Sequence, residues 1–230
     1  ELKWATVTSI EGAIEASFLN NKIGFELAGY KKTTNDMLLL LPVQGIFGMD
    51  APRQNAGQVQ NTGFDLSIFH NNTVSKDFRY DINFNIAYVR NELTDLKGTE
   101  GKEPGDGRGN FWFLEGYPIG SYYGYEADGL FNSEEEVAKG PTRTGTEQPG
   151  DIRYKDLNGD GKIDAANDRK VIGKEFPSWT AGLGANLYYK DFDLSFFFQG
   201  AFDVDAYVNG EAAYAFFNGG KVLERHLDRW

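Results

Sequence analysis

The sequence predicts an all-β fold: a segment of a large transmembrane antiparallel β-barrel with long extracellular loops. Apolar and polar residues alternate with a period of two along several long stretches, which is typical of strands with one apolar and one polar face. Aromatic residues make up 15% of the 230 residues and 28 residues are glycine, a composition typical of β-rich proteins. Short and long connections alternate between the expected strands, as in barrels of outer membranes.

Six strands are expected, arranged as three hairpins. In chain order they are expected at residues 4–18, 23–30, 64–68, 78–90, 179–189 and 192–199. Tight turns at 19–22, 71–73 and 190–191 close the hairpins, whereas 31–62 and 94–178 are expected to be long extracellular loops. A short helix is expected after Ser133, because three glutamates follow this potential N-cap.

The stretch 78–90 has the clearest strand pattern. Its even positions, from Phe78 to Tyr88, are all aromatic or isoleucine, and the odd positions between them are mostly polar. At ~3.3 Å per residue this strand reaches roughly 43 Å. Strands of globular proteins average about 5 to 6 residues, so a soluble sandwich with the same apolar stripe in its core is the poorer alternative.

Six strands do not close a plugged transporter barrel, which takes about 22. Residues 1–230 are therefore expected to form part of one barrel domain, with the remaining strands absent from this chain. Isolated from them, the segment would expose unpaired strand edges and an apolar face to water. We expect such a segment to be neither stable in solution nor active.

Composition excludes several classes of protein. The formal net charge is −11 and the basic residues form no stripe, so no nucleic acid is expected as a partner. Cysteine is absent, which excludes thiol catalysis and disulfides. No apolar run approaches the ~20 residues of a membrane helix. No nucleophile motif is present, and the two histidines, His70 and His226, lie far apart in sequence, so we expect no enzyme and no catalytic residues.

Six carboxylates lie on the polar faces of the expected strands. Paired carboxylates could act as acid and base, but a wet barrel lumen also requires solvated groups on this face. The second reading is the stronger one, and it makes these residues part of the lumen wall. They are Glu11, Glu15, Glu26, Asp65, Asp81 and Asp193.

A calcium loop is expected near residue 160. Side-chain oxygens alternate through Asp156, Asn158 and Asp160, and Gly161 follows where such a loop turns sharply. A hydrated turn of Asp, Asn and Gly residues without metal is the alternative. An EF-hand closes with a glutamate at position 12, but Asn167 stands there and the next carboxylate comes one residue late. The expected metal ligands are Asp156, Asn158, Asp160, Lys162 through its carbonyl, Asp164 and Asp168.

An aromatic cluster lies in the second long loop. Flat rings there could stack on sugar rings or on a peptide, or they could pack the loop onto the barrel mouth. The residues expected to bind ligand are Phe111, Trp112, Tyr122 and Tyr123.

The order of several motifs resembles that of one transporter family. The string from Pro149 to Asp164, followed by Asn167–Arg169 and Val171–Gly173, resembles the late extracellular-loop signature of SusC/RagA TonB-linked outer-membrane transporters of Bacteroidetes. The stretch 192–200 resembles the strand that follows it. Further similar landmarks lie at residues 1–4, 18–22, 30–33, 55–63, 116–120 and 125–131. An extra alanine at 165 or 166 departs from the pattern and displaces Asp168.

The resemblance implies a C-terminal barrel fragment of a multi-pass protein in the outer membrane of a Gram-negative bacterium, with the plug and most of the early strands absent from this chain. Proteins of that family import oligosaccharides, or in some cases peptides. A SusD-like surface lipoprotein acts as their lid, and the TonB complex engages a part of the protein that precedes this segment. Outer-membrane lipid is then a further partner, and calcium is a structural cofactor. The alternatives are a calcium-dependent carbohydrate-binding surface module with shorter strands, and a passive porin without a plug.

Overall fold

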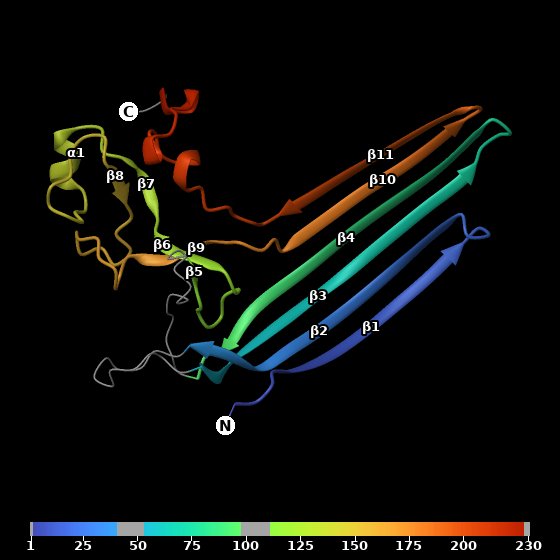
Figure 1. Cartoon of the computed structure of the whole chain (residues 1–230), viewed down its shortest axis with the longest axis horizontal. Helices are drawn as coiled ribbons and strands as arrows, with labels where there is room; N and C mark the ends of the chain where they lie inside the picture. Colours follow the sequence, from blue (N-terminus) through green and yellow to red (C-terminus); the bar gives the residue numbers. More distant parts are fainter. Residues whose placement is uncertain (1, 41–52, 98–110, 228–230) are drawn as a thin grey trace. The chain divides into compact units, whose positions relative to one another are not determined.

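The computed structural model describes the chain except for residues 1, 41–52, 98–110 and 228–230. Six long strands form one antiparallel sheet in the order β1-β2-β3-β4-β10-β11 (Figure 1). All six expected strands are present. Their bounds are β1 Thr6–Phe18, β2 Ile23–Leu40, β3 Arg53–Thr73, β4 Phe78–Asp95, β10 Trp179–Tyr189 and β11 Phe192–Phe202.

The register gathers apolar side chains on one face of this sheet. Phe25 pairs with Ile68, Ile68 with Phe84, Phe84 with Leu183, and Leu183 with Phe198. Directly paired residues point to the same side, so this row of five lies on one face. Ile68 and Phe198 remain 37% and 64% exposed. An apolar face that no other part of the described chain covers is the face that lipid would contact.

Aromatic residues bracket that apolar face near both ends of β4. Toward one end, the rings of Phe64, Tyr88 and Trp179 lie 4.6 to 6.0 Å apart between centroids. Toward the other end, Tyr80 neighbours Phe78 and its hydroxyl group contacts His70 Nδ1 at 3.2 Å. Aromatic girdles of this kind mark the two interfaces of a membrane barrel.

The opposite face is polar and uses glycine for close approach. A Cβ on Gly24 would lie 2.6 Å from the Phe69 ring, and one on Gly63 would lie 2.7 Å from the Tyr30 hydroxyl. The two rings therefore lie across glycines of the neighbouring strands. Glu15 and Glu26 pair directly on this face, and like charges placed opposite each other need a wet surrounding.

The connections differ at the two ends of the sheet. Short turns at 19–22, 74–77 and 190–191 lie at one end, and the longer connections lie at the other (Figure 1). Leu19, Asn20 and Asn21 have positive φ angles, as tight hairpin turns require. The second turn lies at 74–77 rather than at 71–73, because β3 keeps its pairing as far as Thr73 opposite Arg79.

The expected loop 31–62 is shorter in the structure than the sequence pattern indicates. β2 continues to Leu40 and β3 begins at Arg53, and the two remain paired along this extension. Register shifts between Thr34 and Leu38 interrupt the regular alternation there. The described part of this loop is therefore a strand ladder, and the remaining 41–52 lie outside the described residues.

The strand extensions also hold a small core. Val59, Leu93 and Leu96 are 4% exposed or less, and Met37, Phe113 and Ile119 pack against them. The turn at 113–120 is tied to β4, because Leu93 and Tyr117 share a backbone hydrogen bond and Asn91 accepts from the Ile119 N–H. No helix in the described parts of the chain is long and apolar enough to span a membrane.

The chain forms two compact units. The sheet unit comprises residues 1–121 and 176–204, and the loop unit comprises 122–175 and 205–230. The expected loop 94–178 contains most of the small elements, and the 3-10 helices follow β11. These elements are β5 Phe111–Trp112, β6 Ser121–Tyr125, β7 Ala127–Leu130, α1 Glu134–Lys139, β8 Ile152–Tyr154, β9 Arg169–Lys174, η2 Gly210–Ala212, η3 Phe217–Gly219 and η4 Glu224–Leu227.

Candidate functional site

The expected calcium loop folds as a compact turn in which side-chain oxygens accept hydrogen bonds from the loop's own backbone. Asp156 accepts hydrogen bonds from the backbone N–H groups of Gly159 and Gly161, both at 2.6 Å. Asp160 accepts from the Lys162 N–H at 2.8 Å. Gly159 and Gly161 have φ angles of 76° and 82°, a region that favours glycine. The N–H of Gly161 is the main cause that lowers the pKa of Asp156.

Asp168 closes this loop from within. Its carboxylate is fully buried and accepts from the Leu157 N–H at 2.9 Å and from the Asp164 N–H at 2.7 Å. One side chain thus joins the beginning of the loop to its end. The residue that stands one position late for an EF-hand therefore has a defined structural role in the loop.

The residue types fit calcium better than the placement of the carboxylates does. Hard oxygen donors are the ligands that calcium prefers, and Asp156, Asn158, Asp160 and Asp164 supply them within one loop. Across the described residues, however, no three His, Cys, Asp or Glu side chains converge as a metal-binding group. The oxygens of Asp164 are directed to Ala166 and Asn167. The metal site stays a prediction.

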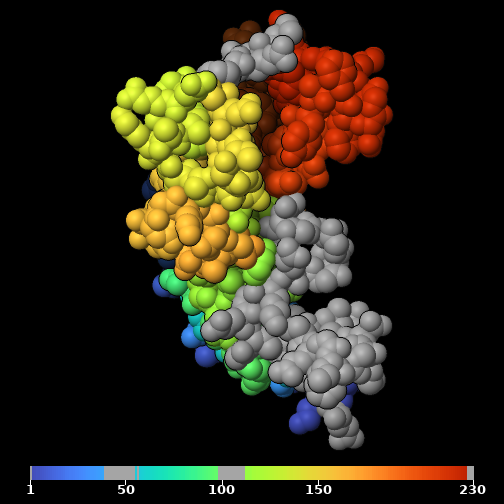
Figure 2. Space-filling view, turned by 90° about the vertical axis from the view of Figure 1, so that its left-hand side faces the viewer, coloured from blue at the N-terminus to red at the C-terminus, as the bar shows by residue number. Residues whose placement is uncertain are grey.

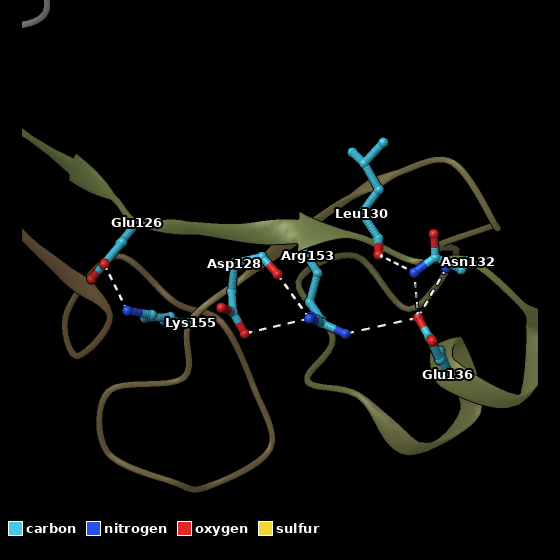
Figure 3. A network of polar contacts seen from close by, with 7 residues as sticks. All are labelled: Glu126, Asp128, Leu130, Asn132, Glu136, Arg153 and Lys155. Atoms are coloured by element: carbon cyan, nitrogen blue, oxygen red, sulfur yellow. Dashed lines mark hydrogen bonds and ion pairs between the residues drawn. The ribbon is translucent and has the colours of Figure 1, made fainter. Parts of the chain in front are cut away.

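A network of ion pairs joins strands β7 and β8 and helix α1 of the loop unit (Figure 3). Arg153 on β8 donates to the Asp128 carbonyl at 2.8 Å and pairs with the Asp128 and Glu136 carboxylates at 3.5 and 3.8 Å. Lys155 pairs with Glu126 at 2.7 Å, and this contact is the main cause that lowers the pKa of Glu126. Ion pairs therefore connect the paired strands β7 and β8 with each other and with α1.

The helix in this unit begins where the sequence predicts. Ser133 has an extended backbone conformation, and its side chain accepts from the Glu136 N–H at 3.2 Å. Glu136 in turn accepts from the Asn132 N–H at 2.9 Å, and this bond is the main cause that lowers its pKa. The cap therefore orients Glu136 toward Arg153.

A second tight turn, at residues 142–147, is built around one carboxylate. Glu147 accepts from the N–H groups of Arg143 and Thr144 at 2.8 and 2.7 Å, and from the Thr142 hydroxyl at 2.7 Å. These bonds lower the pKa of Glu147 far below its usual value, the Thr144 N–H contributing most. The turn also forms a parallel bridge to the expected calcium loop, between Thr142 and Lys162.

A pocket of about 260 Å³ lies beside this turn. Sequence reasoning did not predict it, because its walls come from four separate segments without a shared motif. The only local signal was the cluster of turn-forming residues at 140–150. Its lining residues are Phe131, Pro141, Arg143, Thr144, Glu147, Asp151, Ile152, Tyr154 and Ile163.

The aromatic residues expected to bind ligand are not presented alike. Tyr122 is 8% exposed, and its hydroxyl accepts from the Tyr207 N–H at 3.3 Å. It therefore packs inside the loop unit. Tyr123 lies under the Arg169 guanidinium at 5.3 Å and is half-buried, as is Trp112. The side chain of Phe111 lies outside the described part of the structure. The ligand-binding role of the four residues stays a prediction.

The fold and its two faces define a class of protein. Long antiparallel strands with one exposed apolar face, one polar face and aromatic residues near both ends of the apolar face form the wall of a transmembrane β-barrel. Short turns at one end and elaborate loops at the other are the further marks of this class.

The chain belongs to the TonB dependent receptor-like β-barrel family, whose family model matches residues 1–225. TonB-dependent receptor P3 of Formosa agariphila is 31% identical over 204 residues, which are 86% of this chain and 20% of that protein. TonB-dependent receptor SusC of Bacteroides thetaiotaomicron is 30% identical over 203 residues, which are 85% of this chain and 19% of that protein. The chain thus spans about a fifth of the length of these curated relatives.

Solved structures show a similar fold. The RagAB peptide importer in its open-open state superposes with a TM-score of 0.72 at 24% identity, over 89% of this chain and 21% of the other. Its closed-closed state gives a TM-score of 0.68 over 88% of this chain and 22% of the other. The family and the fold agree with the resemblance drawn from the motifs.

Proposed function

We propose that this chain is part of the barrel wall of a TonB-dependent importer in the outer membrane, with an oligosaccharide or a peptide as cargo. The observation that carries the proposal is the pair of contrasting faces on one sheet. The row from Phe25 to Phe198 gives a lipid-facing surface, and Glu15, Glu26 and Asp65 give a solvated inner one. The chain takes part in transport and not in a chemical step.

The inner face supports the passage of polar cargo. The side chains of Asn83 and Asn85 lie directly over Gly184 and Gly182 of the neighbouring strand. A Cβ on these glycines would lie 2.5 and 2.4 Å from the respective amide oxygens. Amides and carboxylates on a flat wall can exchange hydrogen bonds with water and with hydroxylated or amide-bearing cargo. Such a wall suits oligosaccharides and peptides alike.

We assign a SusD-like surface lipoprotein as the partner at the loop end of the barrel, and the TonB complex as the source of energy. The similarity to SusC and to RagAB supports both partners. The size of the folded loop unit supports the first, because an ordered unit with its own ion-pair network offers a fixed surface to a partner.

The test is to extract the native protein from outer membranes in detergent, measure its intact mass and identify what co-purifies. A parent several times heavier than 25.7 kDa, bound to a surface lipoprotein, is the expected result. A species of 25.7 kDa in the soluble fraction would overturn the proposal and favour a calcium-dependent carbohydrate-binding module instead.

We propose calcium as a structural ion of the loop 156–168. The support is the set of oxygen donors within one tight turn, with Asp168 holding its two ends together. Calorimetric titration of the full-length protein with calcium is expected to show binding that Asp160→Asn weakens. Glu134→Gln removes one exposed charge from α1 and is the matched control. No binding by the unaltered protein, or equal binding by Asp160→Asn, would contradict the site.

A further inference from the structure

The turn at 142–147 presents the side chain of Arg143, whose guanidinium forms no ion pair or hydrogen bond among the described residues. The guanidinium carbon of Arg143 lies 5.1 Å from the centre of the Tyr125 ring and 6.0 Å from that of Tyr154. The two rings themselves lie 5.4 Å apart. Throughout the described chain, no carboxylate forms an ion pair with Arg143, whereas Arg153 nearby pairs with two. Among the described residues, the interactions of the Arg143 guanidinium are therefore these two cation–π contacts.

The two carboxylates that line the pocket with Arg143, those of Glu147 and Asp151, accept hydrogen bonds from other residues. Both oxygens of Glu147 accept hydrogen bonds from residues 142–144, as described above. One oxygen of Asp151 accepts from the Gln148 N–H at 2.8 Å. Neither group contacts the guanidinium. An arginine that lies over two rings and whose N–H groups form no ion pair within the described chain is suited to bind a carboxylate through two parallel hydrogen bonds.

The pocket limits the charge and the size of what can bind. With Arg143, Glu147 and Asp151 in its lining, its formal charge is −1, which repels a doubly charged anion such as phosphate more than a carboxylate, so an anion binds here only through direct contact with Arg143. Its volume of about 260 Å³ is below the ~300 to 1,000 Å³ of sites that enclose a whole drug-sized ligand. One residue of a longer chain fits this space better than a complete oligomer does.

The remaining walls suit an amphipathic residue. Phe131 and Ile163 are 1% and 4% exposed and form an apolar floor, while Ile152 at 48% exposure stands at the rim. The second oxygen of Asp151 can accept from a hydroxyl or an ammonium group. Residues 141–155, in yellow in Figure 2, lie at the surface of the loop unit. Arg143, Thr144 and Ile152 of the lining are exposed, so the pocket opens to solvent.

We propose that this pocket is a capture subsite for a carboxylate group of the cargo, with Arg143 as the residue that binds it. The proposal rests on the proposed import function and specifies the chemistry of the cargo. A peptide with a free C-terminus and an acidic oligosaccharide share this chemistry. The neighbouring tyrosines orient Arg143, and Glu147 keeps the turn that presents it.

The experiment uses the full-length transporter in detergent and calorimetric titration with two matched pairs of probes. One pair is a pentapeptide mixture with free or amidated C-termini, and the other is an oligogalacturonate and its methyl ester. The unaltered protein is expected to bind the free acid of at least one pair about tenfold or more tightly than its neutral form, as loss of a charge-assisted hydrogen bond predicts. The pair that shows the preference identifies the source of the carboxylate.

Variants assign the preference to the pocket. Arg143→Gln is expected to abolish the preference for the acid, and Arg143→Lys to retain part of it because the charge remains. Lys221→Gln removes an exposed cation elsewhere in the loop unit and is expected to leave the preference unchanged. Equal binding of acid and neutral probes by the unaltered protein, or a preference that survives in Arg143→Gln, would overturn the proposal.

Uptake assays separate this failure from failure of the proposed function. If cells that carry the unaltered protein take up neither member of either pair and no other glycan or peptide, the import function is wrong. If they import cargo but do not distinguish acids from neutral forms, only the carboxylate subsite is wrong. Heat-modifiable migration of Arg143→Gln on gels checks that its barrel is assembled.

Discussion

Replacing Ile68 by arginine would place a charge at the middle of the apolar face of the sheet. Ile68 pairs with Phe84, which lies midway between Tyr80 and Tyr88 of the two aromatic groups. The eight residue steps between those tyrosines span roughly 26 Å along the strand. With a tilt of about 40°, they span roughly 20 Å across the membrane, within an apolar band of about 25 Å.

The expected loss of stability follows from that depth. Arginine at the midplane of a barrel's lipid face costs about 2 to 4 kcal/mol, which corresponds to roughly 30- to 700-fold in the folding equilibrium. Ser67→Arg changes the adjacent residue on the polar face and is expected to have a small effect. Thr62→Arg lies on the apolar face beyond Tyr88, level with Arg90, and is expected to cost about 0 to 1 kcal/mol.

The assay is the fraction of full-length protein that assembles in the outer membrane, together with the temperature at which its compact form is lost on gels. We expect Ile68→Arg to lower both, and Ser67→Arg and Thr62→Arg to stay near the unaltered protein. Equal losses for Ile68→Arg and Ser67→Arg would refute the assignment of the faces. Equal losses for Ile68→Arg and Thr62→Arg would refute the assignment of depth.

Three further predictions concern local structure. Hydrogen bonds depress the pKa of Glu147 in the folded turn. The ionised carboxylate therefore stabilises the turn fully above its ordinary pKa of about 4.3, and this contribution is lost as the pH falls through the lower pKa of the folded state. Glu147→Gln should accordingly increase proteolysis at 142–147 at neutral pH. Ser133→Ala should cost about 1 kcal/mol and increase hydrogen exchange in α1. Gly24→Val should reduce barrel assembly more than Gly12→Val, because only Gly24 contacts Phe69.

The sequence predicts the sheet well where each strand meets two different surroundings. From Phe78 to Tyr88 one face meets apolar neighbours and the other meets polar ones. Apolar and polar residues therefore alternate along the sequence, as their side chains alternate between the two faces. The pattern fails from Lys31 to Leu40, although β2 continues there. Outside the apolar band neither face is selected for lipid, so the backbone ladder continues without an alternating sequence.

The candidate site is predictable only where its parts are local. The turn at Gly161 and the cap at Ser133 depend on residues within a few positions, and both are present as expected. The pocket around Arg143 depends on contacts between distant segments, such as the bridge from Thr142 to Lys162. No periodicity or motif spacing records such a contact, so the sequence does not reveal it.

The bridge between Thr142 and Lys162 has a thermodynamic consequence. The Thr142 carbonyl accepts from the Ile163 N–H at 2.8 Å, and Ile163 forms part of the pocket floor. A ligand that orders the turn at 142–147 also restricts the loop 156–168, and an ion that orders the loop 156–168 also restricts the turn. The second binding event then costs less conformational entropy than it would alone. Such coupling is reciprocal. If an ion in the loop 156–168 raised the affinity of the pocket for its ligand, the bound ligand would raise the affinity of the loop for the ion by the same factor.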